Sequence, residues 1–220
     1  MGMKLDAISV GTPQTKVWKG REIRTSIFKS PLQHPVEVSF TGIAGDRQSD
    51  TKLHGGVTRP ISVFASEYYS FWKEELGVSE LPWGNFGENL NIQGGMFEDE
   101  LHVGDQFAIG TTLLEVVQPR FPCYKLGMKL GNDQWIKVFL DSRKTGFYFG
   151  VLQEGIISPG DAVRPHYKAE NSISIADITE LYMFDKTNIA LLKKAIATPR
   201  LTGSWKDYFE KKLEKINNVI

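Results

Sequence analysis

The sequence predicts a mainly β protein of the α+β class, in which a β-barrel precedes a small three-helix domain. The chain has 220 residues, about one and a half ordinary domains. Its first two thirds hold short β-forming runs with glycine and proline at the breaks. The composition changes after residues 164–166, where three helical patterns follow one another. We therefore expect a barrel domain over residues 1–165 and a helical domain over residues 172–220.

The predicted strands are short apolar runs separated by turn residues. Residues 36–40 alternate apolar and polar side chains, as a strand with one buried face does. Residues 101–109 and 111–118 flank Gly110, which predicts a hairpin. This spacing of strands favours a barrel over a doubly wound sheet. The predicted strands are 4–10, 23–28, 36–40, 61–64, 101–109, 111–118 and 147–152.

Helices are predicted from capping residues and from helical spacing of apolar residues. Ser66 is expected to cap a helix that Gly77 terminates. In the C-terminal part, Ser174 and Asp177 form a capping arrangement before the first of three helices. The remaining predicted helices are 133–140, 188–197 and 204–216.

The composition is that of an ordinary globular protein. The chain has 26 Lys and Arg against 26 Asp and Glu, and its mean hydropathy is -0.25. This charge balance argues against a general nucleic-acid binder, which needs excess cations to displace counterions. No apolar run is long enough to span a membrane, and the N-terminus lacks the pattern of a signal peptide, so we expect a cytoplasmic protein. The single cysteine excludes an intramolecular disulfide framework and an all-cysteine metal cage.

The lone cysteine lies in a stiff and charged segment, residues 118–125. Two prolines restrict the backbone there, and Arg120 and Lys125 favour the thiolate form of Cys123. A thiolate binds metals and attacks electrophiles. A lone cysteine is also commonly a buried apolar residue, so the segment leaves both interpretations open.

A second candidate segment, residues 45–59, contains paired glycines. Gly55 and Gly56 let the backbone approach another group closely and can donate N–H groups to an anion. The basic and donor side chains around the pair are Lys52, His54 and Arg59. The alternative is a surface loop with solvated charges, because the Gly-Lys-Ser/Thr of a P-loop does not follow.

The third candidate segment, residues 85–90, carries two polar side chains after Gly87. Glu88 and Asn89 can read the edge of a heterocycle by accepting and donating hydrogen bonds. The alternative is a turn followed by a strand, with Asn89 bonded to its own backbone. Taken alone, the segment favours the turn.

Together the three segments resemble the MOSC family, the molybdenum-cofactor sulfurase C-terminal domains, and within it the YiiM-like proteins. YiiM-like proteins also carry a C-terminal three-helix domain, so the resemblance covers nearly the whole chain. The residues that carry it are Gly45-Asp46 with His54-Gly55-Gly56, Phe86-Gly-Glu-Asn-Leu90, and Gln118-Pro-Arg-Phe-Pro-Cys-Tyr-Lys-Leu126, in that order.

The resemblance implies a barrel that binds the molybdenum cofactor, a molybdopterin with one phosphate. Cys123 matches the family cysteine that ligates molybdenum, and thiolates are soft ligands that suit such a metal. The pterin dithiolene would supply further sulfur ligands. The residues expected to hold the cofactor are Arg120, Arg59, His54, Gly55, Gly56, Asn89, Glu88, Lys52, Lys29 and Arg47.

The YiiM-like resemblance implies reduction of N-hydroxylated compounds, with 6-hydroxylaminopurine as the expected type of substrate. The single cysteine excludes a four-cysteine iron–sulfur cluster, so a separate flavoprotein reductase is expected to donate the electrons. One alternative is a carrier of the cofactor or of sulfur that turns over no substrate. Others are a thiol enzyme with Cys123 as nucleophile and His54 as base, and a regulatory protein acting through its helices. The aromatic helix at residues 68–72 favours a homodimer if its rings are buried between two chains.

Overall fold

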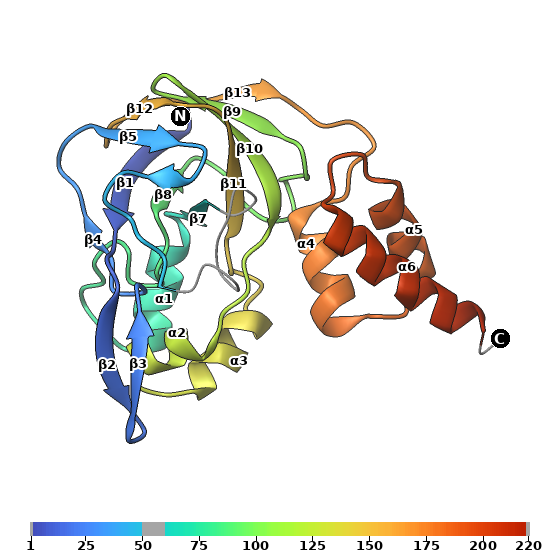
Figure 1. Cartoon of the computed structure of the whole chain (residues 1–220), viewed down its shortest axis with the longest axis horizontal. Helices are drawn as coiled ribbons and strands as arrows, with labels where there is room; N and C mark the ends of the chain where they lie inside the picture. The colour runs from blue at the N-terminus through green and yellow to red at the C-terminus, as the bar shows by residue number, and fades with distance from the viewer. Residues whose placement is uncertain (1, 50–59, 219–220) are drawn as a thin grey trace.

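The computed structural model describes residues 2–49 and 60–218. Eight of its strands form one sheet: β1 (Lys4–Val10), β4 (Ser30–Pro31), β7 (Ile61–Ala65), β8 (Leu90–Gln93), β9 (Gln106–Ile109), β10 (Thr112–Pro119), β11 (Phe147–Gln153) and β13 (Val163–Tyr167). The strand order is β13-β9-β10-β11-β7-β8-β1-β4, and only β7 and β8 run parallel. The sheet curls into a half-barrel (Figure 1), which confirms the predicted mainly β architecture.

Backbone hydrogen bonds draw the first strand of the chain to the start of the last one. The Leu5 N–H donates to the Asp161 carbonyl oxygen at 2.9 Å. The Val163 N–H donates to the Met3 carbonyl oxygen at 3.0 Å. These bonds link β1 to the beginning of β13, two strands that are not neighbours in the sheet order, and so they curl the sheet.

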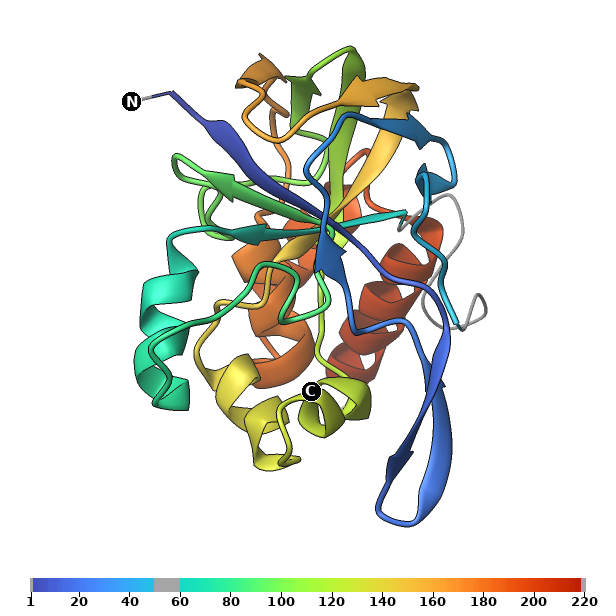
Figure 2. The same ribbon diagram turned by 90° about the vertical axis from the view of Figure 1, so that its left-hand side faces the viewer.

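Two smaller sheets complete the β-structure. One contains β12 (Gly155–Ile157), β5 (Val36–Ser39) and β6 (Gly42–Ile43), and the other is the hairpin of β2 (Gln14–Trp18) and β3 (Arg21–Thr25). The hairpin projects from the body of the protein (Figure 2). Lys19 and Gly20 have φ of 50° and 75°, as a two-residue type I′ turn requires. The prediction of one strand over residues 23–28 was wrong at its end, because β3 stops at Thr25.

Three helices pack beside the half-barrel before the C-terminal part begins. They are α1 (Tyr68–Leu76), α2 (Tyr124–Lys129) and α3 (Gln134–Asp141). The sequence predicted α1 and α3 and missed α2. Gly77 ends α1 in the left-handed conformation, as predicted. The capping role expected for Ser66 was wrong, because α1 has Glu67 at its N-cap and Ser66 offers only its backbone oxygen to the Tyr69 N–H at 3.1 Å.

The C-terminal part contains α4 (Ile175–Thr179), a π-helical turn η1 (Glu180–Phe184), α5 (Ile189–Ala197) and α6 (Gly203–Asn217). The Ser174 side chain accepts a hydrogen bond from the Asp177 N–H at 3.0 Å, which confirms the predicted cap. The π-helical turn was not predicted. Buried residues of these helices, such as Ile178 and Phe209, belong to the same hydrophobic core as Val116 of β10. The helical region is therefore packed on the half-barrel (Figure 1).

A separate aromatic core lies beneath α1 and α3. Phe64, Trp72, Phe86 and Phe139 are fully buried there, and the Trp72 and Phe139 rings stack at 4.8 Å. Tyr69 is also buried within the chain. Tyr69 and Trp72 of α1 are thus covered by their own chain, so their burial does not support the expected homodimer, which stays a prediction. None of the helices in the described part of the chain is long and apolar enough to cross a membrane.

Candidate functional site

A cavity of about 120 Å³ is lined by residues of β3, β7, β11 and α2 and of the segments between such elements. Its described lining is Thr25, Ser26, Ile27, Lys29, Asp46, Gln48, Ser49, Ser62, Gly87, Asn89, Arg120, Phe121, Pro122, Cys123, Lys125, Leu126 and Tyr148. All three candidate segments contribute to this list through residues that the structure describes. Tertiary packing thus brings together three segments that lie far apart in the sequence.

Cys123 lies between the end of β10 and the first turn of α2. It is the N-cap of α2, with an extended backbone at φ -122° and ψ 174°. The residue is partly exposed and lines the cavity, so the interpretation as a fully buried apolar cysteine does not hold. Lys125, the second residue of α2, lines the same cavity and donates to the Ser49 hydroxyl at 3.3 Å.

Arg120 is a buried cation with one unused donor. Only 7% of the residue is exposed. Its backbone N–H donates to the Gly146 carbonyl oxygen at 3.0 Å, and its Nη2 donates to the Phe86 carbonyl oxygen. Its Nη1 is buried and has no hydrogen-bond partner among the described residues. Such a group is costly to bury unless a ligand accepts from it.

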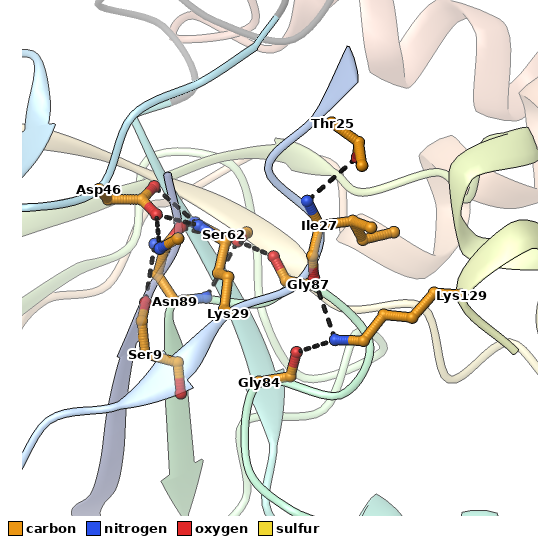
Figure 3. Close-up of polar contacts among 11 residues, drawn as sticks. Ser9, Thr25, Ile27, Lys29, Asp46, Ser62, Gly84, Gly87, Asn89 and Lys129 are labelled. Atoms are coloured by element: carbon orange, nitrogen blue, oxygen red, sulfur yellow. Dashed lines mark hydrogen bonds and ion pairs between the residues drawn. The ribbon is translucent and has the colours of Figure 1, made fainter. Parts of the chain in front are cut away.

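Lys29 and Asp46 form a buried ion pair in the cavity wall (Figure 3). The Lys29 Nζ contacts both carboxylate oxygens of Asp46 at 2.7 Å, and the side chains are 8% and 5% exposed. Burial lowers the pKa of Lys29, and Asp46 opposes this by stabilising the ammonium. Asp46 also accepts from the Gly11 N–H at 2.7 Å. The carboxylate therefore fixes the lysine beside the cavity, a role the sequence had not assigned to Asp46.

Asn89 lines the cavity and hydrogen-bonds to two of the strands beside it. Its Oδ1 accepts from the Ser62 hydroxyl at 2.9 Å and from the Ser62 N–H at 3.1 Å. Its Nδ2 donates to the Ser9 carbonyl oxygen at 3.1 Å (Figure 3). These bonds join β1 to β7, so Asn89 holds two strands together as well as facing the cavity.

Glu88 does not line the cavity, which corrects the expectation that it would face a ligand. It is fully buried and accepts hydrogen bonds from two backbone N–H groups, those of Gly84 and Phe86. The Tyr69 hydroxyl and the Asn91 amide also donate to it. Burial, together with the Glu88 carboxylate, raises the pKa of Tyr69 and keeps that hydroxyl protonated as a donor. Glu88 thus organises the loop that carries Gly87 and Asn89.

Lys129 is a second, partly buried lysine that the sequence did not indicate. Its Nζ donates to the Gly84 carbonyl oxygen at 2.8 Å and to the Ile27 carbonyl oxygen at 3.0 Å (Figure 3). It therefore ties α2 to two segments of the cavity wall. This role could not be inferred from the sequence, because α2 was not predicted. The helix is what turns the Lys129 side chain toward Ile27 and Gly84.

The remaining predicted residues are either elsewhere or outside the described part of the chain. Arg47 is exposed and is not part of the cavity lining, so the structure does not bring it to the site. The sequence also overlooked Phe121 and Tyr148 as wall residues. Lys52, His54, Gly55, Gly56 and Arg59 lie outside the described residues.

The charge of the cavity suits an anionic ligand. Its described lining carries Lys29, Arg120 and Lys125 against one carboxylate, Asp46. Neither Arg120 nor Lys125 pairs with a carboxylate of the described residues. The described residues also hold no cluster of three or more His, Cys, Asp or Glu that could bind a metal by themselves. A metal at Cys123 would need most of its ligands from a bound molecule, and the unused Arg120 donor and the local positive charge fit such an anionic molecule.

Comparison with known proteins places the chain in a family. Residues 50–164 match the MOSC domain, and residues 173–215 match the YiiM-like, 3-alpha helix domain. The YflK protein of Bacillus subtilis (strain 168) is 33% identical over 210 residues, 96% of this chain and 94% of YflK. A protein named Reductase from Gibberella moniliformis (strain M3125 / FGSC 7600) is 27% identical over 183 residues, 82% of this chain and 32% of that protein.

The fold agrees with this assignment. The crystal structure of YiiM from Geobacillus stearothermophilus has a TM-score of 0.78 and 34% sequence identity to this chain. The match covers 96% of this chain and 99% of the other. It includes both the half-barrel and the C-terminal helices, since nearly the whole of each chain is aligned. The chain is therefore a member of the MOSC family, with a YiiM-like arrangement of a MOSC domain followed by three helices.

Proposed function

We propose that this protein is a molybdenum-cofactor-dependent reductase of N-hydroxylated compounds, with 6-hydroxylaminopurine as the type of substrate. MOSC domains are associated with the molybdenum cofactor, and one relative of this chain is named Reductase. The observation that carries the proposal is the cavity that Cys123 lines together with Arg120 and Lys125, two cations without carboxylate partners among the described residues. A thiolate ligand beside an anion-binding surface is what a metal bound to an anionic pterin requires.

The residues of the cavity have separate tasks in this proposal. Cys123 supplies a thiolate ligand for the metal. The Arg120 Nη1, which has no partner among the described residues, donates to an anionic oxygen of the cofactor. Lys29 is already bound by Asp46, so it contributes a fixed positive charge rather than a mobile one. Phe121 and Tyr148 give the wall flat apolar surfaces, which suit a planar base.

When bound, the cofactor supplies the two-electron reduction R–NHOH + 2 e⁻ + 2 H⁺ → R–NH₂ + H₂O. The protein side chains then bind and orient the substrate and exclude water from the reacting nitrogen. A separate flavoprotein reductase supplies the electrons, because one cysteine cannot hold an iron–sulfur cluster of its own.

The Cys123→Ser variant tests the metal ligand. Serine is a good N-cap residue, so we expect α2 and the fold to be kept while bound molybdenum and turnover of 6-hydroxylaminopurine are lost. The assay uses protein purified from a host that makes the cofactor, with a flavoprotein reductase and NADH supplied. A variant that retains both molybdenum and turnover would contradict the assignment of Cys123.

Arg120→Ala tests the anion site, with Arg164→Ala on the exposed face of β13 as the matched control. Loss of a charge-assisted hydrogen bond to a fixed anion predicts a decrease in bound pterin of roughly tenfold or more. The control should keep the wild-type pterin content. Equal pterin content in wild type and Arg120→Ala would contradict this role.

The second candidate function is a carrier that binds the cofactor without turnover, because a carrier needs the same cysteine and cations. Purified protein that holds molybdenum and pterin, yet reduces no N-hydroxylated base with any supplied reductant, would favour the carrier. Protein without molybdenum and pterin from a competent host would exclude both candidates and leave a thiol enzyme.

A further inference from the structure

The C-terminal helices contact the segment that carries Cys123 through a cluster of aromatic rings. Phe121 lies two residues before Cys123 and lines the cavity. Its ring centroid is 5.0 Å from that of Tyr182 in η1 and 6.2 Å from that of Trp205 in α6. Tyr182 and Trp205 also meet edge to face at 5.1 Å, with an angle of 84° between their planes. The ring of a cavity residue is thus held from outside by two rings of the helical region.

A hydrogen bond adds a second link between the helical region and the same segment. The Trp205 Nε1 donates to the Gln118 side-chain oxygen at 3.3 Å, and only 4% of Gln118 is exposed. On the barrel side, the Arg120 N–H is bonded to Gly146. Residues 118–123 are therefore held between the half-barrel on one side and the C-terminal helices on the other.

The π-helical turn gives Tyr182 its place in this contact. A π-helical turn inserts an extra residue into a helix, which turns the following side chains to a new direction, and such turns are frequent at functional sites. The turn makes two further contacts, both with Arg143, which lies in the segment between α3 and β11. Arg143 pairs with Glu180 at 3.1 Å, and its guanidinium lies 3.4 Å from the centre of the Phe184 ring. Tyr182 lies between Glu180 and Phe184 in the sequence and contacts Phe121 instead.

We propose that Tyr182 and Trp205 are positioning residues, which hold Phe121 so that Arg120 and Cys123 face the cavity. The three-helix region is in this view an outer wall of the site rather than an independent module. The ligand of that site rests on the proposed function, but the positioning of the segment does not. Pro119 and Pro122, which flank Arg120 and Phe121, strengthen the effect, because a stiff segment transmits a displacement of Phe121 directly to its neighbours.

The test compares three full-length variants. Tyr182→Ala removes the ring that contacts Phe121, and Tyr182→Phe keeps the ring. Phe184→Ala is the matched control, because it removes a ring of the same turn that packs on Arg143 instead. Cys123 is the only cysteine of the chain, so the rate of alkylation by iodoacetamide in the folded protein reports on it alone. Bound molybdenum and pterin, and the midpoint of thermal unfolding, are measured on the same samples.

We expect Tyr182→Ala to raise the alkylation rate by roughly tenfold, the population change that loss of the ring contacts with Phe121 and Trp205 can produce. Cofactor content should fall in parallel, and Tyr182→Phe should restore both values. Phe184→Ala should keep the wild-type alkylation rate even if its unfolding midpoint falls as far as that of Tyr182→Ala. An unchanged rate in Tyr182→Ala, or an equal increase in Phe184→Ala, would overturn the inference. Wild-type protein without molybdenum would refute the proposed function and leave the alkylation comparison valid.

Discussion

Lys129 places a partly buried ammonium group between two segments that border the cavity. Its two acceptors are the carbonyl oxygens of Ile27 and Gly84, and it forms no ion pair with a carboxylate of the described residues. Burial lowers the pKa of Lys129 from 10.5 to about 8, although the charge of Glu88 opposes the change. The stability of the protein should therefore depend on pH above neutrality through this one side chain.

The sign and size of the effect follow from proton binding. Between about pH 8 and 10.5 the unfolded chain keeps a proton on Lys129 that the folded protein has released. The unfolded state then binds more protons, so the free energy of unfolding rises with pH in this window. One pH unit corresponds to about 1.36 kcal/mol, which sets an upper limit of about 3.4 kcal/mol at high pH. Between about pH 7 and 9.5 the same relation gives about 2 kcal/mol.

Urea unfolding of the wild type and of Lys129→Met at these two pH values measures the effect. The free energy of unfolding of the wild type, relative to the variant, should increase by about 2 kcal/mol from the lower to the higher pH. Other titrating groups cancel in this difference. Lys193→Met, at an exposed position of α5, is the control and should show a constant difference. A pH-independent difference for Lys129→Met would refute the reasoning that a buried ammonium without a carboxylate partner is present there.

Three further predictions concern the residues that build the cavity wall. Lys29→Met leaves the buried Asp46 carboxylate without its cation. The free energy of unfolding, measured in urea, should therefore fall by about 3–5 kcal/mol. A free energy of unfolding equal to that of the wild type would argue against a tight ion pair. Glu88→Gln puts an amide where a carboxylate accepts four hydrogen bonds. The same assay should show a loss of about 2–3 kcal/mol, and an unchanged free energy of unfolding would show that the loop does not depend on the carboxylate. Gly87→Ala adds a Cβ at φ +82°, 2.7 Å from the Ile27 side chain. Thermal unfolding should therefore show that the variant is less stable by about 1–3 kcal/mol. An unchanged midpoint of unfolding would show that the loop has room for the methyl group.

The sequence predicted those elements whose signals are local. Ser174 and Asp177 form their cap within one turn of helix, and Gly77 terminates α1 by its own backbone conformation. The hairpin around Gly110 pairs Ile109 with Thr112, as expected. The first predicted strand of that hairpin was too long, because Asp105 accepts from the His102 N–H and forms a turn before β9 begins. The pattern of apolar residues does not reveal a turn that is closed by a hydrogen bond from the backbone to a side chain.

The candidate site was predicted less completely. Arg120 and Cys123 were identified from their neighbours in the sequence, and both line the cavity. Glu88 was expected to face a ligand, but its full burial with four donors makes it part of the framework. Whether a polar side chain faces a cavity or the interior depends on the direction of the backbone at that point. That direction cannot be inferred from a single sequence.

The family, the mainly β architecture with C-terminal helices, and the segment that carries Cys123 could be predicted from the amino-acid sequence alone. These depend on short motifs and on periodic patterns, which are properties of neighbouring residues. Three contacts became evident only in the folded chain: Asp46 fixes Lys29, Lys129 ties α2 to the cavity wall, and Tyr182 contacts Phe121. The partners in these contacts are 17, 45 and about 60 residues apart. Their meeting depends on how the sheet curls and how the helices pack against it, because long-range contacts form only when the whole chain folds.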